Sequence, residues 1–256
     1  MNMIKLNTIL GTALMGTSLM AFNLTGSVGV MGVTGTSPYQ GVGTQEAIAP
    51  VFEVRSGDFF MRTGEVRYSV FSMGYDLIKD DRANLSLIIN PLGGYRVKRS
   101  DLPNGYKNIE ERKYQFEGGV KFSYATGWEN IHFGAYALGG EHGNQVGGSI
   151  FRPFRITEKL TVVPRAYVTY FDEDYVDYYF GVSQSEADRN SSISKEYKPD
   201  GGVTTGLDIA INYNISETWS IAGFAGVENL SSEITNSPIV ERDNIYRTGL
   251  GVSYHF

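Results

Sequence analysis

The last eight residues, Gly249-Leu-Gly-Val-Ser-Tyr-His-Phe256, decide the fold class of this 256-residue chain. The even-numbered residues of this segment are Leu, Val, Tyr and Phe, and the odd-numbered ones are Gly, Gly, Ser and His. Such alternation predicts a β-strand with one apolar face and one small or polar face. Soluble domains rarely end this way, because chain ends usually fray into water. A transmembrane β-barrel must end on a complete amphipathic strand, since its last strand pairs with its first.

The same segment has the spacing of a membrane-insertion signal. Gly251, Tyr254 and the terminal Phe256 resemble the C-terminal residues that the outer-membrane insertion machinery reads. The segment departs from that pattern at Gly249, where a polar residue is usual. We expect Phe256 to lie in the periplasmic aromatic girdle of a barrel.

The N-terminus has the pattern of a secretory signal peptide. Lys5 supplies a positive charge, residues 9–20 are apolar or small and uncharged, and Ala21 closes a cleavage sequence. The apolar segment is shorter than the ~20 residues of a transmembrane helix, and no other stretch of the sequence approaches that length. We therefore predict a signal peptide over residues 1–21 and a single barrel domain over residues 22–256.

Composition excludes several classes of protein. The chain has no cysteine, which excludes a disulfide scaffold, a thiolate metal site and a lipoprotein anchored through cysteine. A net charge of −6 argues against a nucleic-acid partner, because nucleic-acid binding needs a basic surface. The sequence contains no glycine-rich phosphate loop, so we predict no cofactor.

Alternation of apolar and polar residues recurs along the chain. It is clearest over residues 66–70, 114–124, 160–170 and 207–215. In the first of these stretches Val66, Tyr68 and Val70 oppose Arg67 and Ser69. A period of two is typical of a sheet with two unlike faces. In a bilayer the apolar face meets lipid and the polar face lines the lumen of a barrel.

Twelve strands are predicted, over residues 26–35, 47–56, 57–63, 64–78, 83–97, 113–126, 129–140, 145–156, 159–171, 204–215, 217–229 and 245–256. Short connections near residues 78–83, 126–130, 155–159 and 215–218 mostly alternate with longer ones near 97–112, 141–144, 172–203 and 230–244. This asymmetry is typical of a bacterial barrel with tight periplasmic turns and long surface loops. Strand bounds shift by several residues in such an analysis, so ten or fourteen strands remain compatible. Pro164 inside a strand predicts a bulge or a rim position, because proline lacks the N–H of the ladder.

Three motifs, in order, resemble the MipA/OmpV family of outer-membrane proteins. They are Asp177-Tyr-Tyr-Phe-Gly-Val-Ser183 with Glu186-Ala187, Tyr197 and Gly201-Gly202 after it, then Tyr213-Asn-Ile-Ser-Glu-Thr-Trp-Ser220, then Asn236-Ser-Pro-Ile-Val240. Ser37-Pro-Tyr-Gln-Gly41 and Gly57-Asp-Phe-Phe60 fit the early region of the family. The residues that carry the resemblance best are Tyr178, Tyr179, Phe180, Gly181, Val182, Ser183, Ser237, Pro238, Ile239 and Val240. The likeness covers essentially the whole mature chain.

The resemblance implies an all-β protein, a transmembrane antiparallel up-and-down β-barrel in the outer membrane of a Gram-negative bacterium. Its surroundings would be outer-membrane lipid and lipopolysaccharide. It implies a non-enzymatic scaffold that contacts a lytic transglycosylase and a murein synthase during cell-wall enlargement. Two alternatives remain open, a small pore and a surface adhesin that uses the long loops, above all residues 172–203. A lipid-modifying enzyme is a third class, and it would need one of the three histidines.

Few residues carry chemistry of their own. The spacing of His132, His142 and His255 matches no common metal-ligand motif, and strand parity brings no serine to a histidine on the outer face. The acidic cluster of residues 172–177 suits either Ca²⁺ ligation or a solvated loop, and we predict no metal site. The aromatic residues at 175–180 are interpreted as an interfacial girdle.

Charged residues also fall on the predicted lumen face. They are Arg67, Glu117, Lys121, Arg165, Asp208 and Arg247. Two interpretations compete, since the charges either pair across a narrow lumen or line a small aqueous pore. The mixed signs favour pairing over a strongly ion-selective channel.

Overall fold

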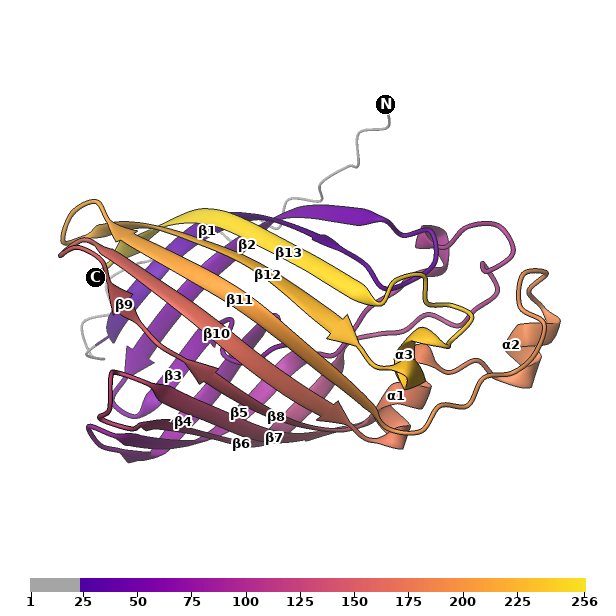
Figure 1. Ribbon diagram of the computed structural model, residues 1–256, viewed down its shortest axis with the longest axis horizontal. Coiled ribbons are helices and arrows are strands. Elements are labelled where there is room, and N and C mark those ends of the chain that lie inside the picture. Colours follow the sequence, from indigo (N-terminus) through magenta and orange to yellow (C-terminus); the bar gives the residue numbers. More distant parts are fainter. Residues whose placement is uncertain (1–23) are drawn as a thin grey trace.

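The computed structural model describes residues 24–256, which form a barrel with a compact cluster of loops and helices at one end (Figure 1). The predicted signal peptide over residues 1–21 lies outside these described residues. Thirteen hydrogen-bonded segments follow one another around the wall, and β8 and β9 are two parts of one wall strand because both pair with β10. The protein is therefore a closed antiparallel barrel of twelve strands.

The strands are β1 (Leu24–Thr36), β2 (Thr44–Ser56), β3 (Phe59–Thr63), β4 (Phe71–Lys79), β5 (Ala83–Gly93), β6 (Gln115–Ala125), β7 (His132–Gly140), β8 (Gly143–Phe151), β9 (Phe154–Arg155), β10 (Leu160–Phe171), β11 (Gly202–Asn214), β12 (Trp219–Leu230) and β13 (Asn244–His255). The helices are α1 (Glu173–Phe180), α2 (Gln184–Asp188) and α3 (Ser232–Thr235), with a 3-10 turn, η2, over Arg99–Asp101. With two exceptions, described below, the predicted strand bounds are right to within three residues.

The terminal strand closes the barrel as the sequence predicts. β13 pairs with β1 from Ser27 opposite His255 to Gly35 opposite Arg247. Beyond this ladder the backbones of Gly26 and Phe256 exchange two hydrogen bonds, of 3.1 and 3.0 Å. No helix within residues 24–256 is long and apolar enough to cross a membrane.

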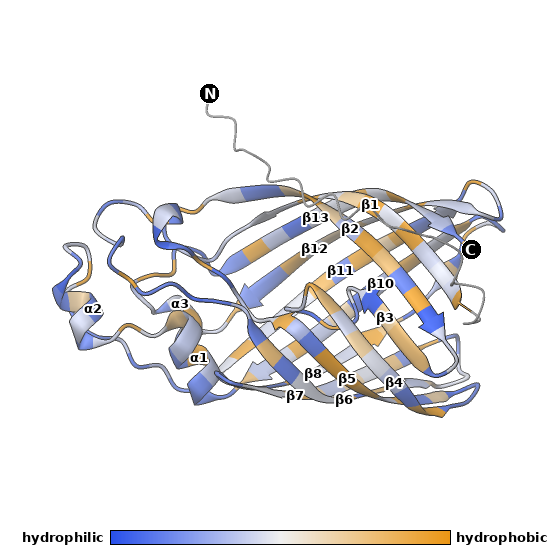
Figure 2. Cartoon of the chain, turned by 180° about the vertical axis from the view of Figure 1, so that it is seen from behind, coloured by the Kyte–Doolittle hydropathy of each residue, from blue (hydrophilic) through white to orange (hydrophobic). Residues whose placement is uncertain are grey.

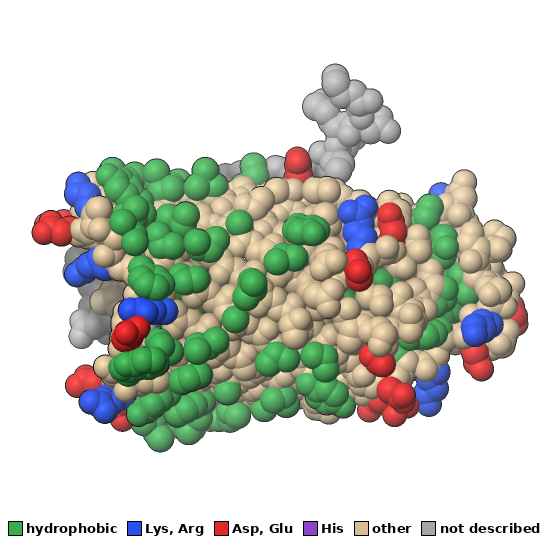
Figure 3. All heavy atoms as spheres, viewed as in Figure 1, with side chains coloured by type: hydrophobic (Ala, Val, Ile, Leu, Met, Phe, Trp, Pro, Cys, Tyr) green, Lys and Arg blue, Asp and Glu red, His purple; other side chains and the backbone are tan. Residues whose placement is uncertain are grey.

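The outer surface of the barrel is apolar where the strands run. Alternate residues of each strand carry hydrophobic side chains outward, among them Val28, Val30, Phe122, Leu207, Ile209, Ile211 and Leu250. The hydropathy colours change from residue to residue along the strands, and hydrophobic side chains gather over the barrel but thin out toward the loop end (Figures 2 and 3). Exposed aromatic side chains, Phe59, Trp128, Trp219, Tyr254 and Phe256, lie at or near the short-turn end. This pattern is that of a lipid-facing band.

Pro164 lies at an interruption of the wall. It pairs with Ile209 of β11, while on its other side β8 ends at Phe151 and β9 begins at Phe154. The carbonyl of Pro164 accepts from the N–H of Arg152 at 3.3 Å, so the proline nitrogen faces the same break. The register is the same on both sides of the break, so it is an interruption of the ladder and not the predicted bulge, and the N–H that proline lacks is a physical reason for it.

The strand predicted over residues 64–78 is wrong in its first half, because residues 64–70 turn into the lumen and β4 begins only at Phe71. Gly64 and Tyr68 adopt left-handed backbone conformations, with φ of 70° and 61°, which end the extended chain. Val66 and Tyr68 are consequently buried and do not face lipid. Because residues 64–70 leave the wall, Thr44–Val51 of β2 pairs with β1 alone among the described residues.

The strand predicted over residues 83–97 also ends early, at Gly93, where its pairing with β6 shifts register. Gly94 follows with a φ of 83°, a conformation that glycine adopts readily. The connection predicted as long near residues 141–144 is a tight turn of two residues, Glu141 and His142. The remaining long connections all leave the same end of the barrel.

Candidate functional site: a plugged mouth above a charged lumen

The two ends of the barrel differ in construction. At one end the turns contain two to six residues, as at 57–58, 80–82, 126–131, 156–159 and 215–218. At the other end lie the connections 37–43, 64–70, 94–114, 172–201 and 231–243. Long loops mark the extracellular side of an outer-membrane barrel and short turns the periplasmic side. Both chain ends of the described barrel, Leu24 and Phe256, lie at the periplasmic side.

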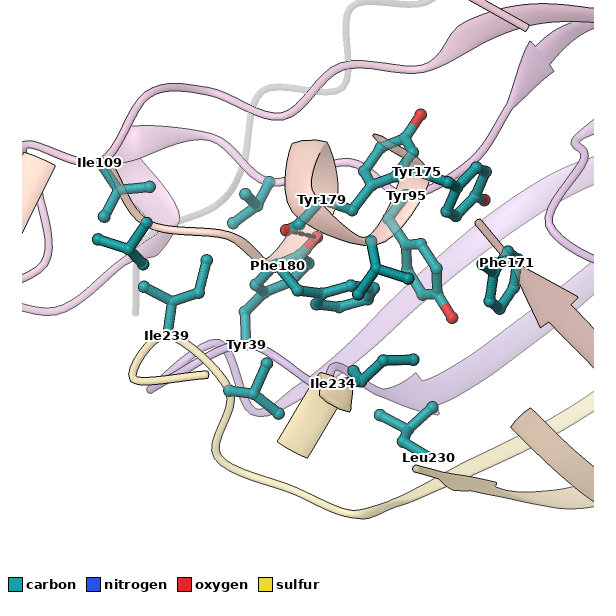
Figure 4. Close-up of a cluster of buried hydrophobic side chains, with 14 of the residues drawn as sticks. Tyr39, Tyr95, Ile109, Phe171, Tyr175, Tyr179, Phe180, Leu230, Ile234 and Ile239 are labelled. Atoms are coloured by element: carbon teal, nitrogen blue, oxygen red, sulfur yellow. Dashed lines mark hydrogen bonds between the residues drawn. The ribbon is translucent and has the colours of Figure 1, made fainter. Parts of the chain in front are cut away.

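The long connections pack against one another and close the extracellular mouth. We call this assembly the loop plug. Its buried hydrophobic residues are Tyr39, Tyr68, Tyr95, Val97, Leu102, Ile109, Phe171, Tyr175, Val176, Tyr179, Phe180, Val182, Ala187, Ile193, Leu230, Ile234, Ile239, Val240 and Ile245. They come from five separate connections and from the adjoining strand ends (Figure 4). Burial of this much apolar surface makes the plug a small hydrophobic core rather than a set of mobile loops.

Helix α1 is the centre of the plug. Asp172 caps it by accepting from the N–H of Tyr175 at 3.0 Å, and the same carboxylate accepts from the N–H of Asn144 at 3.0 Å. The helix buries one face, formed by Tyr175, Val176, Tyr179 and Phe180. The interpretation of this aromatic run as an interfacial girdle is therefore wrong, because helical spacing turns the side chains inward to the plug.

Aromatic contacts and hydrogen bonds join α1 to distant connections. The ring of Phe180 lies 5.7 Å from Tyr39 and 5.1 Å from Tyr95, measured between centroids. The hydroxyl of Tyr39 donates to the carbonyl of Tyr179 at 3.1 Å, and burial raises the pKa of Tyr39 far above its ordinary range (Figure 4). The Tyr39 phenol is therefore neutral at physiological pH and acts as a hydrogen-bond donor.

The structure brings the two most specific family motifs together. The hydroxyl of Ser237 donates to the carbonyl of Phe180 at 2.5 Å. Val182 forms an isolated bridge with Tyr197, and Val240 forms another with Tyr39. In the first motif Tyr178 stacks on His142, Gly181 ends α1 and Ser183 caps α2. In the second, Pro238 lies in the turn after α3 and Ile239 is buried. These residues build the plug.

A buried ion pair fixes the outer layer of the plug. Arg112 donates through Nη2 to the carbonyl of Gly181 at 2.9 Å and to Glu186 at 3.1 Å. Burial opposes ionisation of Glu186, but the N–H of Ser183 and the charge of Arg112 outweigh it and lower the pKa of this carboxyl. Ser183 and Glu186 also form a reciprocal capping box, whose spacing is already visible in the sequence.

Beneath the plug the lumen holds the predicted charges, and most of them are paired. Arg67 reaches Glu228 at 2.8 Å and Asp208 at 3.3 Å, and Arg165 reaches Asp208 at 3.0 Å. Lys121 reaches Glu65 at 2.6 Å. Glu117 is held by amides, accepting from Gln145 at 2.8 Å, Gln115 at 2.9 Å and Asn90 at 3.3 Å. Pairing across the lumen is thus the better of the two interpretations, although a cavity remains.

The three histidines lie apart. His132 stacks on Phe151, His142 stacks on Tyr178, and His255 lies with its Nε2 2.8 Å from the hydroxyl of Ser220. Strand parity excludes a serine–histidine pair on the outer face only, whereas this contact forms on the lumen face. Within residues 24–256 no carboxylate hydrogen-bonds to His255. This histidine therefore lacks the third group that orients the base of a serine nucleophile.

The acidic residues after β10 do not converge. Asp172 is occupied as the cap of α1, and Glu173 pairs with Lys198 at 3.3 Å. Across the part of the chain that the structure describes, no group of three or more His, Cys, Asp or Glu side chains is placed to hold a metal ion.

Comparison with known proteins identifies the family. The model of the family described as "MltA-interacting protein MipA" matches residues 28–256. The chain belongs to this family. Among its relatives, the 24 kDa outer membrane protein of Pasteurella multocida is 26% identical over 97% of this chain and 98% of the relative. The MltA-interacting protein of Escherichia coli K12 is 25% identical over 92% and 90%, and the outer membrane protein OmpV of Vibrio cholerae is 30% identical over 61% and 60%.

Solved barrels resemble the chain in overall arrangement only. The KdgM porin in complex with disordered oligogalacturonate aligns with a TM-score of 0.47 at 10% identity, over 90% of this chain and 99% of that one. The COG4313 outer membrane channel from Pseudomonas putida F1 aligns with a TM-score of 0.45 at 12% identity, over 91% and 96%. Together with the named relatives and the lipid-facing band, the MipA-family match places this protein in the outer membrane.

Proposed function

We propose that this MipA-family barrel is a non-enzymatic scaffold that docks a lytic transglycosylase, and with it a murein synthase, at the periplasmic side of the outer membrane. The family description and the Escherichia coli relative both carry the name MltA-interacting protein. A scaffold needs a rigid, anchored body, and a barrel closed by twelve paired strands supplies one.

The observation that carries the proposal is the loop plug. An open diffusion pore needs a continuous aqueous path, whereas here the extracellular mouth is filled by a buried hydrophobic core. Tyr175, Val176, Tyr179 and Phe180 of α1 are each 0% exposed, so packed apolar side chains occupy the centre of the plug. A barrel that is closed outward and anchored in lipid suits a role on its periplasmic side.

The surface offered to a periplasmic partner is formed by the short turns. It carries exposed acidic residues, Asp58, Asp80, Asp81, Glu129, Glu158 and Glu217, interspersed with the bases Arg82, Arg155 and Lys159. Charged rims of this kind set association rates and partner choice more than they set affinity. A docking enzyme would therefore present a complementary, mixed-charge face.

The experiment is a crosslink in intact envelopes, followed by purification through a tag in the extracellular loop 184–200 and mass spectrometry of the partners. We expect a lytic transglycosylase or murein synthase above the level of a control barrel. The double substitution Asp81→Lys and Glu217→Lys at the periplasmic turns should weaken its recovery. Glu196→Lys in an extracellular loop is the matched control and should leave recovery unchanged. Recovery of only insertion machinery and lipopolysaccharide contradicts the proposal.

The alternatives make different predictions. A small pore gives steady conductance when the purified barrel is placed in a planar bilayer. A surface adhesin loses attachment of cells when α2 and the following residues 189–196 are deleted, because this segment is the outermost exposed part of the plug. The scaffold predicts neither result.

A further inference from the structure

The lumen beneath the loop plug contains a cavity of about 730 Å³ that the proposed scaffold function does not use. Its roof includes Tyr68, a residue of the plug. Its walls extend to Asn84 and Ser123, which lie within two residues of the periplasmic ends of β5 and β6. The chamber therefore lies beneath the plug and extends toward the periplasmic end of the barrel.

Small side chains leave this space free. The lumen face around the chamber includes Ser123, Gly134, Ser149, Ala210 and Gly226. A barrel of this width would otherwise be filled by larger inward side chains. The volume falls in the range of pockets that bind small molecules.

Positive charge faces the chamber and negative charge lies behind it. Six bases line the cavity, Arg55, Arg62, Arg67, Lys121, Arg165 and Arg247, against two acids, Glu65 and Asp208. The side chains of Arg165 and Arg247 are 43% and 32% exposed, whereas their acidic neighbours Asp208 and Glu228 are 7% and 0% exposed. An entering ligand therefore meets guanidinium groups before it meets carboxylates.

One row of the sheet organises two of these arginines. Arg165 of β10 lies opposite Asp208 of β11, Asp208 opposite Gly226 of β12, and Gly226 opposite Arg247 of β13. Neighbouring strands are ~4.8 Å apart, so the backbones of Arg165 and Arg247 lie about 14 Å apart, and Gly226 between them leaves room for the side chain of Asp208. The two arginines stand at the ends of this row, and both line the chamber.

The two arginines have hydrogen-bonding capacity to spare. Arg165 uses Nε and Nη2 on Asp208, which leaves Nη1 without a partner among the described residues. Arg247 stands 3.6 Å from Glu228, and within residues 24–256 its guanidinium donates no hydrogen bond. Arg67, Arg165 and Arg247 together face two carboxylates, Asp208 and Glu228, so this cluster carries one positive charge in excess.

We propose that Arg165 and Arg247 form a binding site for a small anion, carrying a carboxylate or phosphate group, that enters from the periplasm. Guanidinium forks match both groups bidentately, and charge-assisted hydrogen bonds are the strong ones. The site is independent of the scaffold function, because it lies inside the barrel and the docking surface lies on its rim.

The test is isothermal titration calorimetry of the purified barrel in non-ionic detergent, with citrate and inorganic phosphate as separate probes at low ionic strength. We expect saturable binding of at least one probe, and the probe that binds assigns the carboxylate or the phosphate class. Arg165→Gln and Arg247→Gln should each weaken binding about tenfold or more, as loss of one charge-assisted contact predicts. Arg152→Gln, at an ion pair outside the chamber, should bind as the unaltered protein does.

A second variant guards against loss of folding in the arginine variants. Ala210→Glu keeps both arginines and places a carboxylate on the lumen face beside Asp208. It should abolish binding while the barrel keeps its heat-modifiable migration on gels. Failure of both probes to bind, or equal binding by Ala210→Glu and the unaltered barrel, overturns the proposal, and neither outcome bears on the recovery of murein enzymes.

Discussion

Replacing Phe180 by alanine tests whether the loop plug is a cooperative hydrophobic core that closes the barrel. The side chain is 0% exposed and contacts the rings of Tyr39 and Tyr95, which come from two other connections. Its removal leaves a cavity at the point where three segments meet. The barrel wall, held by backbone ladders, does not depend on this contact.

The magnitude follows from the burial. Truncating a buried Phe to Ala costs about 3–5 kcal/mol, the sum of lost apolar burial and the cavity left behind. If that loss falls on local opening of the plug, the open population rises by roughly two to four orders of magnitude, at 1.4 kcal/mol per factor of ten. Local opening of this kind is detected as faster amide exchange.

The assay is hydrogen exchange with mass spectrometry on the refolded barrel in micelles. We expect exchange of the α1 amides, residues 173–180, to accelerate strongly in Phe180→Ala, while β11 amides remain slow. Glu173→Gln is the matched control, since that side chain is exposed on the same helix and should change little. In planar bilayers, Phe180→Ala should add brief openings to a silent barrel. Unchanged exchange in α1, or equal acceleration in β11, would refute the reasoning, and so would steady conductance of the unaltered protein.

Three further predictions concern other parts of the fold. Gly143→Ala should destabilise the plug by about 1–3 kcal/mol, because this φ of 111° disfavours alanine and an added Cβ would lie 2.3 Å from the backbone nitrogen of Tyr175; thermal unfolding monitors the loss. The pKa of Glu186 is lowered on folding, so its pairing with Arg112 stabilises the plug above pH 4.5 and is lost as pH falls through the depressed native value. Proteolysis between residues 184 and 200 should rise in that acid window, and Glu186→Gln should remove the dependence. Deleting Phe256, whose backbone exchanges two hydrogen bonds with Gly26, should reduce the yield of inserted barrel in outer-membrane fractions, and normal assembly would contradict its role as part of the insertion signal.

The wall of the barrel was predictable because its pattern is local. Every second residue meets lipid, so the alternation in Leu207–Asn214 or Leu250–Phe256 specifies both the strand and its outward face. The strand ends follow from turns that are equally local. The prediction failed at residues 64–70, where Gly64 and Tyr68 leave the extended conformation although the sequence continues to alternate. Alternation alone cannot distinguish a strand from a segment that folds into the lumen.

The candidate sites were predictable only in part. Parity alone placed Arg165, Asp208 and Arg247 on the lumen face, and this is confirmed. The partner that Arg67 finds in Glu228 lies 161 residues away, which no sequence spacing can show. Two signals in the sequence indicate the plug helices. They are the helical spacing of the buried residues of α1 and the capping box of Ser183.

The sequence by itself therefore determined a barrel with an even number of strands, and which face of each strand is apolar. Only the tertiary structure decided that the long connections form a closed plug and that a basic chamber remains beneath it. The physical reason is the range of the interactions. Lipid acts on each strand residue separately, whereas the plug residues are buried by one another, and the contacts between Tyr39, Tyr95 and Phe180 exist only once the barrel has brought its loops to one mouth.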